Sequence, residues 1–243
     1  MAATLVRDTD TGALFRGSCT KLFQFIEKKT EANEIVIAVP GGRSIVGFLN
    51  TWHERRSELD RALWKRLHFF LLDERLVELT APESNYRLVN EVFFSKLLAA
   101  GHISNSQLHP FKWQPTSTDN GVSEYEQELK TFQGKFHAVL LGVGEDAHVG
   151  ALFPGHHSIR NDHQGFITLA DSPKPPPARM TASRTLIRSA KFGLAFILES
   201  GKRDALRNYL NPQKTVEQCP AKLINEIEEG YVVTNLLDES EMS

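Results

Sequence analysis

The sequence has little cysteine, no long apolar run and almost no net charge. Its 243 residues include two cysteines, Cys19 and Cys219, too few for a disulfide framework or a zinc cluster, which favours a reducing compartment. No apolar run approaches the length of a membrane span, and the first residues lack the apolar core of a signal peptide. A formal net charge of -2 gives no electrostatic reason to expect nucleic acid or an anionic membrane as a partner. These absences predict a cytoplasmic protein that binds neither nucleic acid nor membranes.

Apolar, β-branched segments alternate along the chain with segments of helical periodicity, and no repeat interrupts them. Strands are predicted over residues 34–39, 67–72, 108–113, 136–143, 165–170, 192–199 and 231–237. Helices are predicted over residues 11–28, 45–52, 84–97, 119–132, 180–190, 202–210 and 221–228. The alternation predicts a single α/β domain over residues 1–243, with a doubly wound, mostly parallel open sheet and helices on both faces.

The most informative stretch follows the buried strand at 136–143. Two glycines, Gly142 and Gly144, allow a sharp turn, and Asp146 and His148 come directly after it. Ligands of open α/β sheets bind outside the carboxyl ends of the strands, which is where this acid and imidazole are expected. The alternative is an ordinary glycine loop with a structural histidine.

Other predicted strands also end in polar motifs. Strand 34–39 leads into Gly41-Gly42-Arg43-Ser44 and then a helix, an arrangement that points backbone N–H groups at an anion, with Ser44 as a candidate cap. A plain tight turn is the alternative. Strand 67–72 leads into Asp73-Glu74-Arg75, interpreted as a substrate-facing acid and base rather than a solvated loop. Lys174 and Arg179 lie on a stiff proline run, and Lys202 lies at a helix start.

Four stretches together resemble the 6-phosphogluconolactonase family, within the wider superfamily of glucosamine-6-phosphate deaminase and ribose-5-phosphate isomerase. They fall in the family's order and spacing over nearly the whole chain. The stretches are Gly41-Gly42-Arg43, Asp73-Glu74-Arg75 with residues 84–88, residues 142–148 with residues 152–155, and residues 172–179. The chain departs from the family at Ser44-Ile45, where Thr-Pro is usual, and at Ala147 and Val149, where Gly and Thr are usual.

The resemblance implies hydrolysis of 6-phospho-D-glucono-1,5-lactone in the oxidative pentose phosphate pathway, with no metal and no nucleotide cofactor. His148 is the predicted general base acting on water, and Asp146, or alternatively Glu145, would orient its ring. The resemblance implies that the phosphate is bound by Arg43, Ser44, Arg179 and Lys202, and Lys174 lies near enough to Arg179 in the sequence to join them. Asp73 is expected to accept hydrogen bonds from the sugar hydroxyls. The developing oxyanion needs donors, and Arg75 with the N–H groups of Gly41 and Gly42 is expected to supply them. A monomer or a small homo-oligomer is expected.

Two other functions fit parts of this pattern. A glucosamine-6-phosphate deaminase would carry a glutamate five residues after the motif histidine, where this chain has Phe153. A non-catalytic sugar-phosphate sensor of the kind found in transcription regulators would need a helix-turn-helix, and the segment before Glu34 holds only about one helix.

Overall fold

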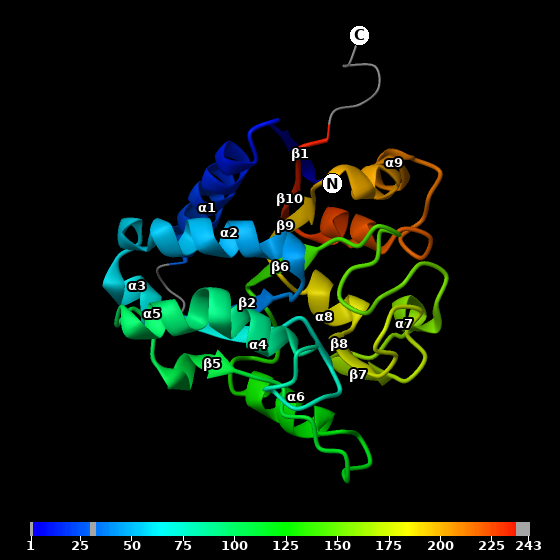
Figure 1. Cartoon of the computed structure of the whole chain (residues 1–243), viewed down its shortest axis with the longest axis horizontal. Coiled ribbons are helices and arrows are strands. Elements are labelled where there is room, and N and C mark those ends of the chain that lie inside the picture. The colour runs from blue at the N-terminus through cyan, green and yellow to red at the C-terminus, as the bar shows by residue number, and fades with distance from the viewer. Residues whose placement is uncertain (1, 30–32, 237–243) are drawn as a thin grey trace.

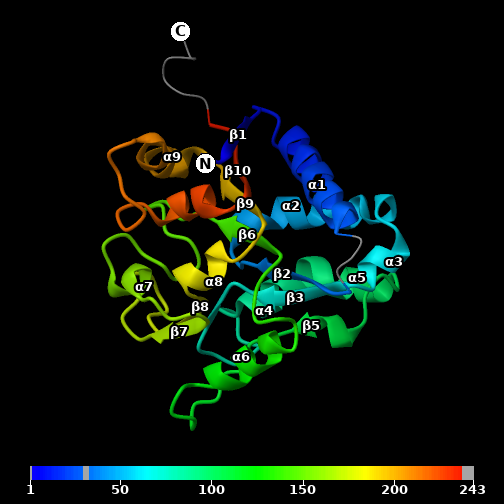
Figure 2. The same cartoon turned by 180° about the vertical axis from the view of Figure 1, so that it is seen from behind.

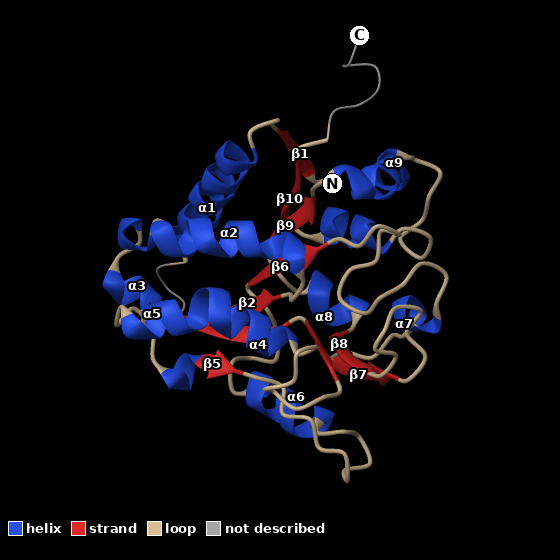
Figure 3. Cartoon of the chain, in the orientation of Figure 1, coloured by secondary structure: helices blue, strands red, loops and turns tan. Residues whose placement is uncertain are grey.

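The computed structural model describes residues 2–29 and 33–236, and within them a seven-stranded parallel sheet organises the molecule (Figures 1 and 3). Its strands are β1 (Thr4–Arg7), β2 (Ile35–Val39), β3 (Leu67–Leu71), β5 (Leu108–His109), β6 (Ala138–Gly142), β9 (Phe192–Ile197) and β10 (Glu229–Thr234). They lie in the order β1-β10-β9-β6-β2-β3-β5, and every neighbouring pair is parallel. The predicted parallel sheet is confirmed.

Helices cover both faces of this sheet, as Figures 1 and 2 show from opposite sides. The α-helices are α1 (Thr11–Lys28), α2 (Arg43–Glu54), α3 (Arg61–Trp64), α4 (Asn85–Val89), α5 (Ser95–Ala99), α6 (Val122–Lys130), α7 (His157–Arg160), α8 (Arg184–Arg188) and α9 (Arg203–Leu210). Short 3-10 or π turns are η1 (Arg56–Glu58), η2 (Asn90–Phe94), η3 (Asn105–Gln107), η4 (Ser200–Lys202) and η5 (Pro220–Glu226).

The sheet divides the core in two because successive residues of a strand point to opposite faces. On β2, Ile35, Ile37 and Val39 join a cluster with the apolar residues of α1 and α2. Val36 and Ala38 of the same strand join a second cluster with residues of α6, α8 and α9. All five β2 side chains are buried, which explains why this strand is a continuous apolar run and confirms the doubly wound architecture.

One predicted helix is wrong in its first part. The structure has a strand, β8 (Arg179–Ala182), followed by α8, where a single helix was predicted over residues 180–190. β8 pairs antiparallel with β7 (Phe166–Leu169) on one side and with β4 (Asp73–Arg75) on the other. All of β8 is buried, so pairing with a strand on each side overrides its local helical pattern. The three strands form a small separate sheet, and Asp73-Glu74-Arg75 is its edge rather than a loop.

Smaller differences concern the ends of elements. β1 was not predicted, and the expected helix at 221–228 is the 3-10 turn η5. Ser44 is not a helix cap, because α2 starts at Arg43 after Gly42, and the cap makes no side-chain hydrogen bond. Leu237, at the end of the predicted closing strand, lies outside the described residues. Within the described residues, no helix combines the length and apolar character needed to cross a membrane.

Candidate active site

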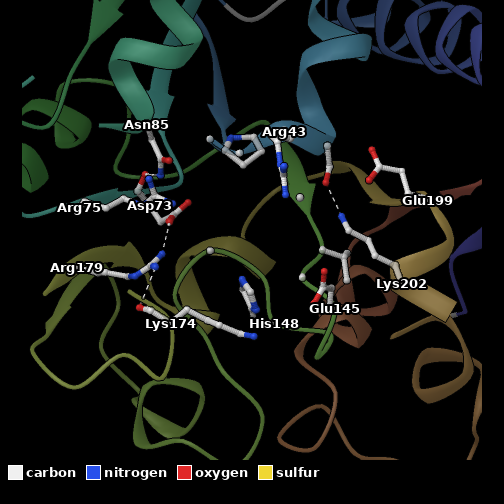
Figure 4. Close-up of a pocket in the computed structure, with 18 residues that line it drawn as sticks. Arg43, Asp73, Arg75, Asn85, Glu145, His148, Lys174, Arg179, Glu199 and Lys202 are labelled. Atoms are coloured by element: carbon white, nitrogen blue, oxygen red, sulfur yellow. Dashed lines mark hydrogen bonds and ion pairs between the residues drawn. The ribbon is translucent and has the colours of Figure 1, made fainter. Parts of the chain in front are cut away.

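A cavity of about 360 Å³ opens beyond the carboxyl ends of β2, β3, β6 and β9, where an open α/β sheet places its ligands (Figure 4). It gathers nearly every residue singled out in the sequence. The lining residues are Pro40, Gly41, Gly42, Arg43, Ser44, Asp73, Arg75, Asn85, Gly142, Val143, Gly144, Glu145, His148, Gly150, Lys174, Arg179, Glu199 and Lys202. Among the predicted site residues, only Asp146 lies outside this lining, and it forms a hydrogen bond with His148.

His148 and Asp146 form a hydrogen-bonded pair at the cavity wall. Nδ1 of His148 bonds Oδ1 of Asp146, and the same oxygen accepts the backbone N–H of His148 at 3.3 Å. Burial opposes ionisation of Asp146, but the hydrogen bond and charge of His148 outweigh it and lower the pKa of Asp146 to about 2. Nε2 of His148 has no hydrogen-bond partner within residues 2–29 and 33–236. The pair therefore offers one free ring nitrogen to the cavity.

The backbone between the two groups is bent to allow this contact. Ala147 has a φ of +69°, in the left-handed region that favours glycine, and it is fully buried. The ring of His148 also lies against Gly144, where an added Cβ would come within 2.1 Å of Cε1. The glycine turn seen in the sequence thus makes room for the imidazole.

The Gly41–Gly42 turn and α2 form a cationic side of the cavity. Gly42 has a φ of +86°, and a Cβ on Gly41 would meet Oδ1 of Asn85 at 1.9 Å, so each position requires glycine for its own reason. Lys202 donates a hydrogen bond to Oγ of Ser44. Burial lowers the pKa of Lys202, and the charges of Glu199 and Glu145 partly oppose this shift.

Arg179, Lys174 and Asp73 lie on the other side of the cavity, with His148 between the two sides in Figure 4. Arg179 donates to the carbonyl oxygens of Pro176 at 3.1 Å, Lys174 at 3.1 Å and Pro175 at 3.0 Å. Its Nη1 lies 3.8 Å from a carboxylate oxygen of Asp73. Burial lowers the pKa of Arg179, opposed by the charge of Asp73. Arg179 therefore fixes the loop that presents Lys174.

Glu74, between two lining residues, faces away from the cavity. Its carboxylate is fully buried and accepts from the backbone N–H groups of Arg75 at 2.7 Å, Asn85 at 2.7 Å and Tyr86 at 2.8 Å. Burial raises its pKa, and these donors oppose the rise. Asp73 and Arg75, the two predicted contacts of this triplet, line the cavity, and Glu74 fastens β4 to the start of α4. Ser84 caps α4, accepting from the N–H of Arg87 at 3.1 Å.

Among the lining residues with polar side chains, three were not predicted as substrate contacts: Asn85, Glu199, and Glu145, which was expected only as an alternative partner of His148. Asn85 is buried and donates to the backbone oxygen of Asp73 at 2.8 Å. Glu199 follows β9 and has φ 74° and ψ 151°, a backbone conformation that is normal only for glycine. Both acids lie just past strand ends, so inspecting every strand end in the sequence would have found them. Asn85 follows no strand and carries no such signal.

Comparisons with known proteins agree with this architecture. Residues 9–233 match the family model for glucosamine-6-phosphate isomerases/6-phosphogluconolactonase. The chain belongs to this family. A Borreliella burgdorferi protein named 6-phosphogluconolactonase is 32% identical over 222 residues, which cover 90% of this chain and 92% of the relative.

Solved structures show that other members of the family share the fold. The 6-phosphogluconolactonase of Thermotoga maritima superposes with a TM-score of 0.79 at 24% identity, covering 96% of this chain and 99% of that one. A monomeric glucosamine-6-phosphate deaminase also gives a TM-score of 0.79, at 19% identity over 96% of this chain and 97% of that one. The fold therefore does not separate the two activities, and the site residues must do so.

Proposed function

We propose that this protein hydrolyses 6-phospho-D-glucono-1,5-lactone to 6-phospho-D-gluconate, in the oxidative pentose phosphate pathway. The observation that carries the proposal is the His148 imidazole, held by Asp146 through Nδ1 and free at Nε2, in a cavity lined by cations. The similarity to named 6-phosphogluconolactonases over most of the chain supports the same reaction.

A lactone is an activated ester, so one positioned base acting on water is sufficient. Nε2 of His148 takes a proton from water as the water oxygen bonds to the lactone carbonyl carbon, and Asp146 stabilises the imidazolium. When the tetrahedral intermediate collapses, the bond to the ring oxygen breaks and the imidazolium returns the proton to that oxygen. We assign Arg75 and the N–H groups of Gly41 and Gly42 to the developing oxyanion.

The phosphate is assigned to the side formed by Arg43, Ser44 and Lys202, where α2 begins. The N-terminus of this 12-residue helix favours an anion, and Lys202 lies bonded to Ser44 directly beside it. Arg179 and Lys174 approach the sugar from the opposite side, and Asp73 accepts hydrogen bonds from its hydroxyls. Arg179 contributes chiefly by holding the loop, since three carbonyl oxygens already accept the N–H groups of its Nε and Nη2.

Deamination of glucosamine 6-phosphate is the second candidate, and the site disfavours it. The resemblance places the deaminase glutamate at the position of Phe153. The Phe153 ring is 1% exposed and packs 4.7 Å from the His148 ring, so a hydrophobic contact stands where that chemistry needs a carboxylate.

Other properties remain predictions that accompany this function. We expect the reaction to need neither metal nor nucleotide, and the protein to act in the cytoplasm, without nucleic acid, as a monomer or small homo-oligomer.

The decisive experiment measures lactone hydrolysis against the spontaneous background, with ammonia release from glucosamine 6-phosphate assayed beside it. Lactone turnover without ammonia is expected. His148→Ala should lower kcat by about 10²–10⁴, the usual contribution of one general base, with an unchanged melting temperature. Near-full turnover by this variant would remove His148 from its assigned role, and ammonia release by the wild type would favour the deaminase.

A further inference from the structure

Two imidazoles and a carboxylate that the lactonase reaction does not use meet beside α7. They belong to His156 and His157, at the start of that helix, and to Asp171, which follows β7. Nε2 of His157 lies 3.0 and 3.2 Å from the two oxygens of Asp171, and Nε2 of His156 lies 3.4 Å from the nearer one. One ligand atom from each residue falls within 4.8 Å of the other two.

The two separations from Asp171 match a shared metal ion. Imidazole nitrogens and carboxylate oxygens bind zinc at about 2.0–2.2 Å, so two ligands of one ion lie about 3–3.6 Å apart. The separations of 3.0 and 3.4 Å from Asp171 are already within this range. Two histidines and one carboxylate form a donor set typical of divalent transition metals, while magnesium and calcium prefer oxygen ligands alone.

One nitrogen of the cluster lies at ion-pair distance from Asp171 but makes no hydrogen bond. The hydrogen bond between His157 and Asp171 satisfies those two side chains. Nε2 of His156, however, is buried without a hydrogen-bond partner, although it points toward the same carboxylate. Buried polar atoms in native proteins nearly always have a partner, so this nitrogen indicates a ligand.

The other nitrogen of His156 has a second partner that can support ligation. Nδ1 accepts the backbone N–H of Ser158 at 3.2 Å and lies 3.0 Å from Oγ of the same residue. Binding of a metal at Nε2 requires the tautomer with hydrogen on Nδ1, which gives up the backbone N–H and donates to the hydroxyl instead. A second hydrogen bond of this kind is what orients most metal-binding histidines.

We propose that His156, His157 and Asp171 bind a divalent transition-metal ion of the zinc class, outside the active-site cavity. His157 and Asp171 are 58% and 63% exposed, so water completes the coordination. The ion joins the turn before α7 to the first residue of the loop that presents Lys174. The ring of Phe153 lies between the sites, 6.0 Å from the His156 ring and 4.7 Å from that of His148.

Calorimetric titration of the chelator-treated full chain with Zn²⁺ tests the proposal without substrate, so its failure leaves the lactonase assignment untouched. One ion per chain is expected. Asp171→Asn and His157→Ala should each weaken binding at least tenfold, since each removes one of three ligands. His163→Ala is the matched control, because this histidine is also exposed and paired with an acid, Glu126 at 2.7 Å, and its affinity should equal that of the wild type.

A second titration separates this cluster from the cavity. His148→Ala should bind Zn²⁺ as the wild type does, and Cu²⁺ added to the wild type should give an electron paramagnetic resonance spectrum with two nitrogen ligands. Loss of the ion in His148→Ala, or equal affinity in the wild type and both ligand variants, would overturn the proposal. The absence of any binding to the wild type would do the same.

Discussion

Two of the imidazole–carboxylate groups in this molecule have similar chemistry but different roles. His148 and Asp146 lie beyond the carboxyl end of β6, beside a cavity. His68 and His109 lie on β3 and β5, where both are buried and the flanking acids are Glu34 and Glu128. In this group, which we call the His68–His109 network, His68 bonds Glu34 at 2.7 Å and His109 bonds Glu128 at 2.6 Å. Nδ1 of His68 lies 2.9 Å from Nε2 of His109.

The His68–His109 network uses all four ring nitrogens of the two histidines. Each carboxylate accepts an N–H from its histidine, and the second nitrogens of the two rings contact each other. The rings of Phe132 and Phe70 pack 4.3 Å from those of His68 and His109, respectively. With no nitrogen left for a substrate, this group stabilises the fold, and His148 differs because its Nε2 remains free.

The largest effect on stability is expected from His109→Ala, which tests whether the two groups have separate roles. The substitution leaves a cavity and removes a partner from both His68 and Glu128, which costs about 3 kcal/mol. For a chain of this size the melting temperature should fall by about 6–12 °C, measured by calorimetry, while kcat/KM at low temperature stays unchanged. His163→Ala, on the surface, should change neither. A loss of turnover in folded His109→Ala would show that the two groups are not separate in function.

Removing a cation from the cavity should have the next largest effect. Lys202→Met keeps the length of the side chain but removes its charge and its bond to Ser44. A hydrogen bond to a charged group is worth about 1.5–3 kcal/mol, so KM for the phosphorylated lactone should rise about 10–100-fold with a smaller change in kcat. Lys191→Met is the control, because this exposed lysine pairs with Glu228 at 3.0 Å, away from the cavity lining. An unchanged KM in Lys202→Met would show that the phosphate binds in another part of the cavity.

The contrast between the two groups also explains how much the sequence could predict. Strand ends in a parallel sheet share one edge, so Gly41, Asp73 and His148 could be brought together from the order of apolar runs alone. The role of Glu74 could not be predicted, because it depends on backbone N–H groups at the start of α4. The strand at Arg179–Ala182 was missed for a similar reason, since it lies between β7 and β4, and β4 is distant in sequence.

Lowering the pH should reduce the stability that the His68–His109 network gives to the fold, because His68 takes up a proton. Burial lowers the pKa of His68 below its usual 6.5, against the charge of Glu34. The unfolded chain therefore takes up a proton before the folded one does, so this contribution is complete above about pH 6.5 and is lost as the pH falls below it. The loss is at most about 1.4 kcal/mol per pH unit, measured by urea unfolding between pH 7 and 5. His68→Gln should flatten that dependence, and an equally steep profile in this variant would assign the dependence to another group.

The smallest effect on stability is expected at Ala147, which joins Asp146 to His148. Its φ of +69° places a Cβ in the left-handed region, at a cost of about 1 kcal/mol that glycine does not have. Ala147→Gly should therefore raise the free energy of unfolding by up to about 1 kcal/mol. The gain is reduced because glycine also makes the unfolded chain more flexible. Two backbone hydrogen bonds keep the turn in place: the N–H of Ala147 donates to the carbonyl of Gly144 at 3.0 Å, and the N–H of Ala221 donates to the carbonyl of residue 147 at 2.9 Å. We therefore expect kcat to change less than twofold.

Ala147→Val is the opposing variant at the same position. A β-branched side chain in the left-handed region of a fully buried turn should destabilise the fold and displace the His148 ring. If glycine lowered kcat as much as valine did, then the alanine would be tuning the position of the imidazole. In that case, strain in the turn would belong to the catalytic machinery and not merely accompany it.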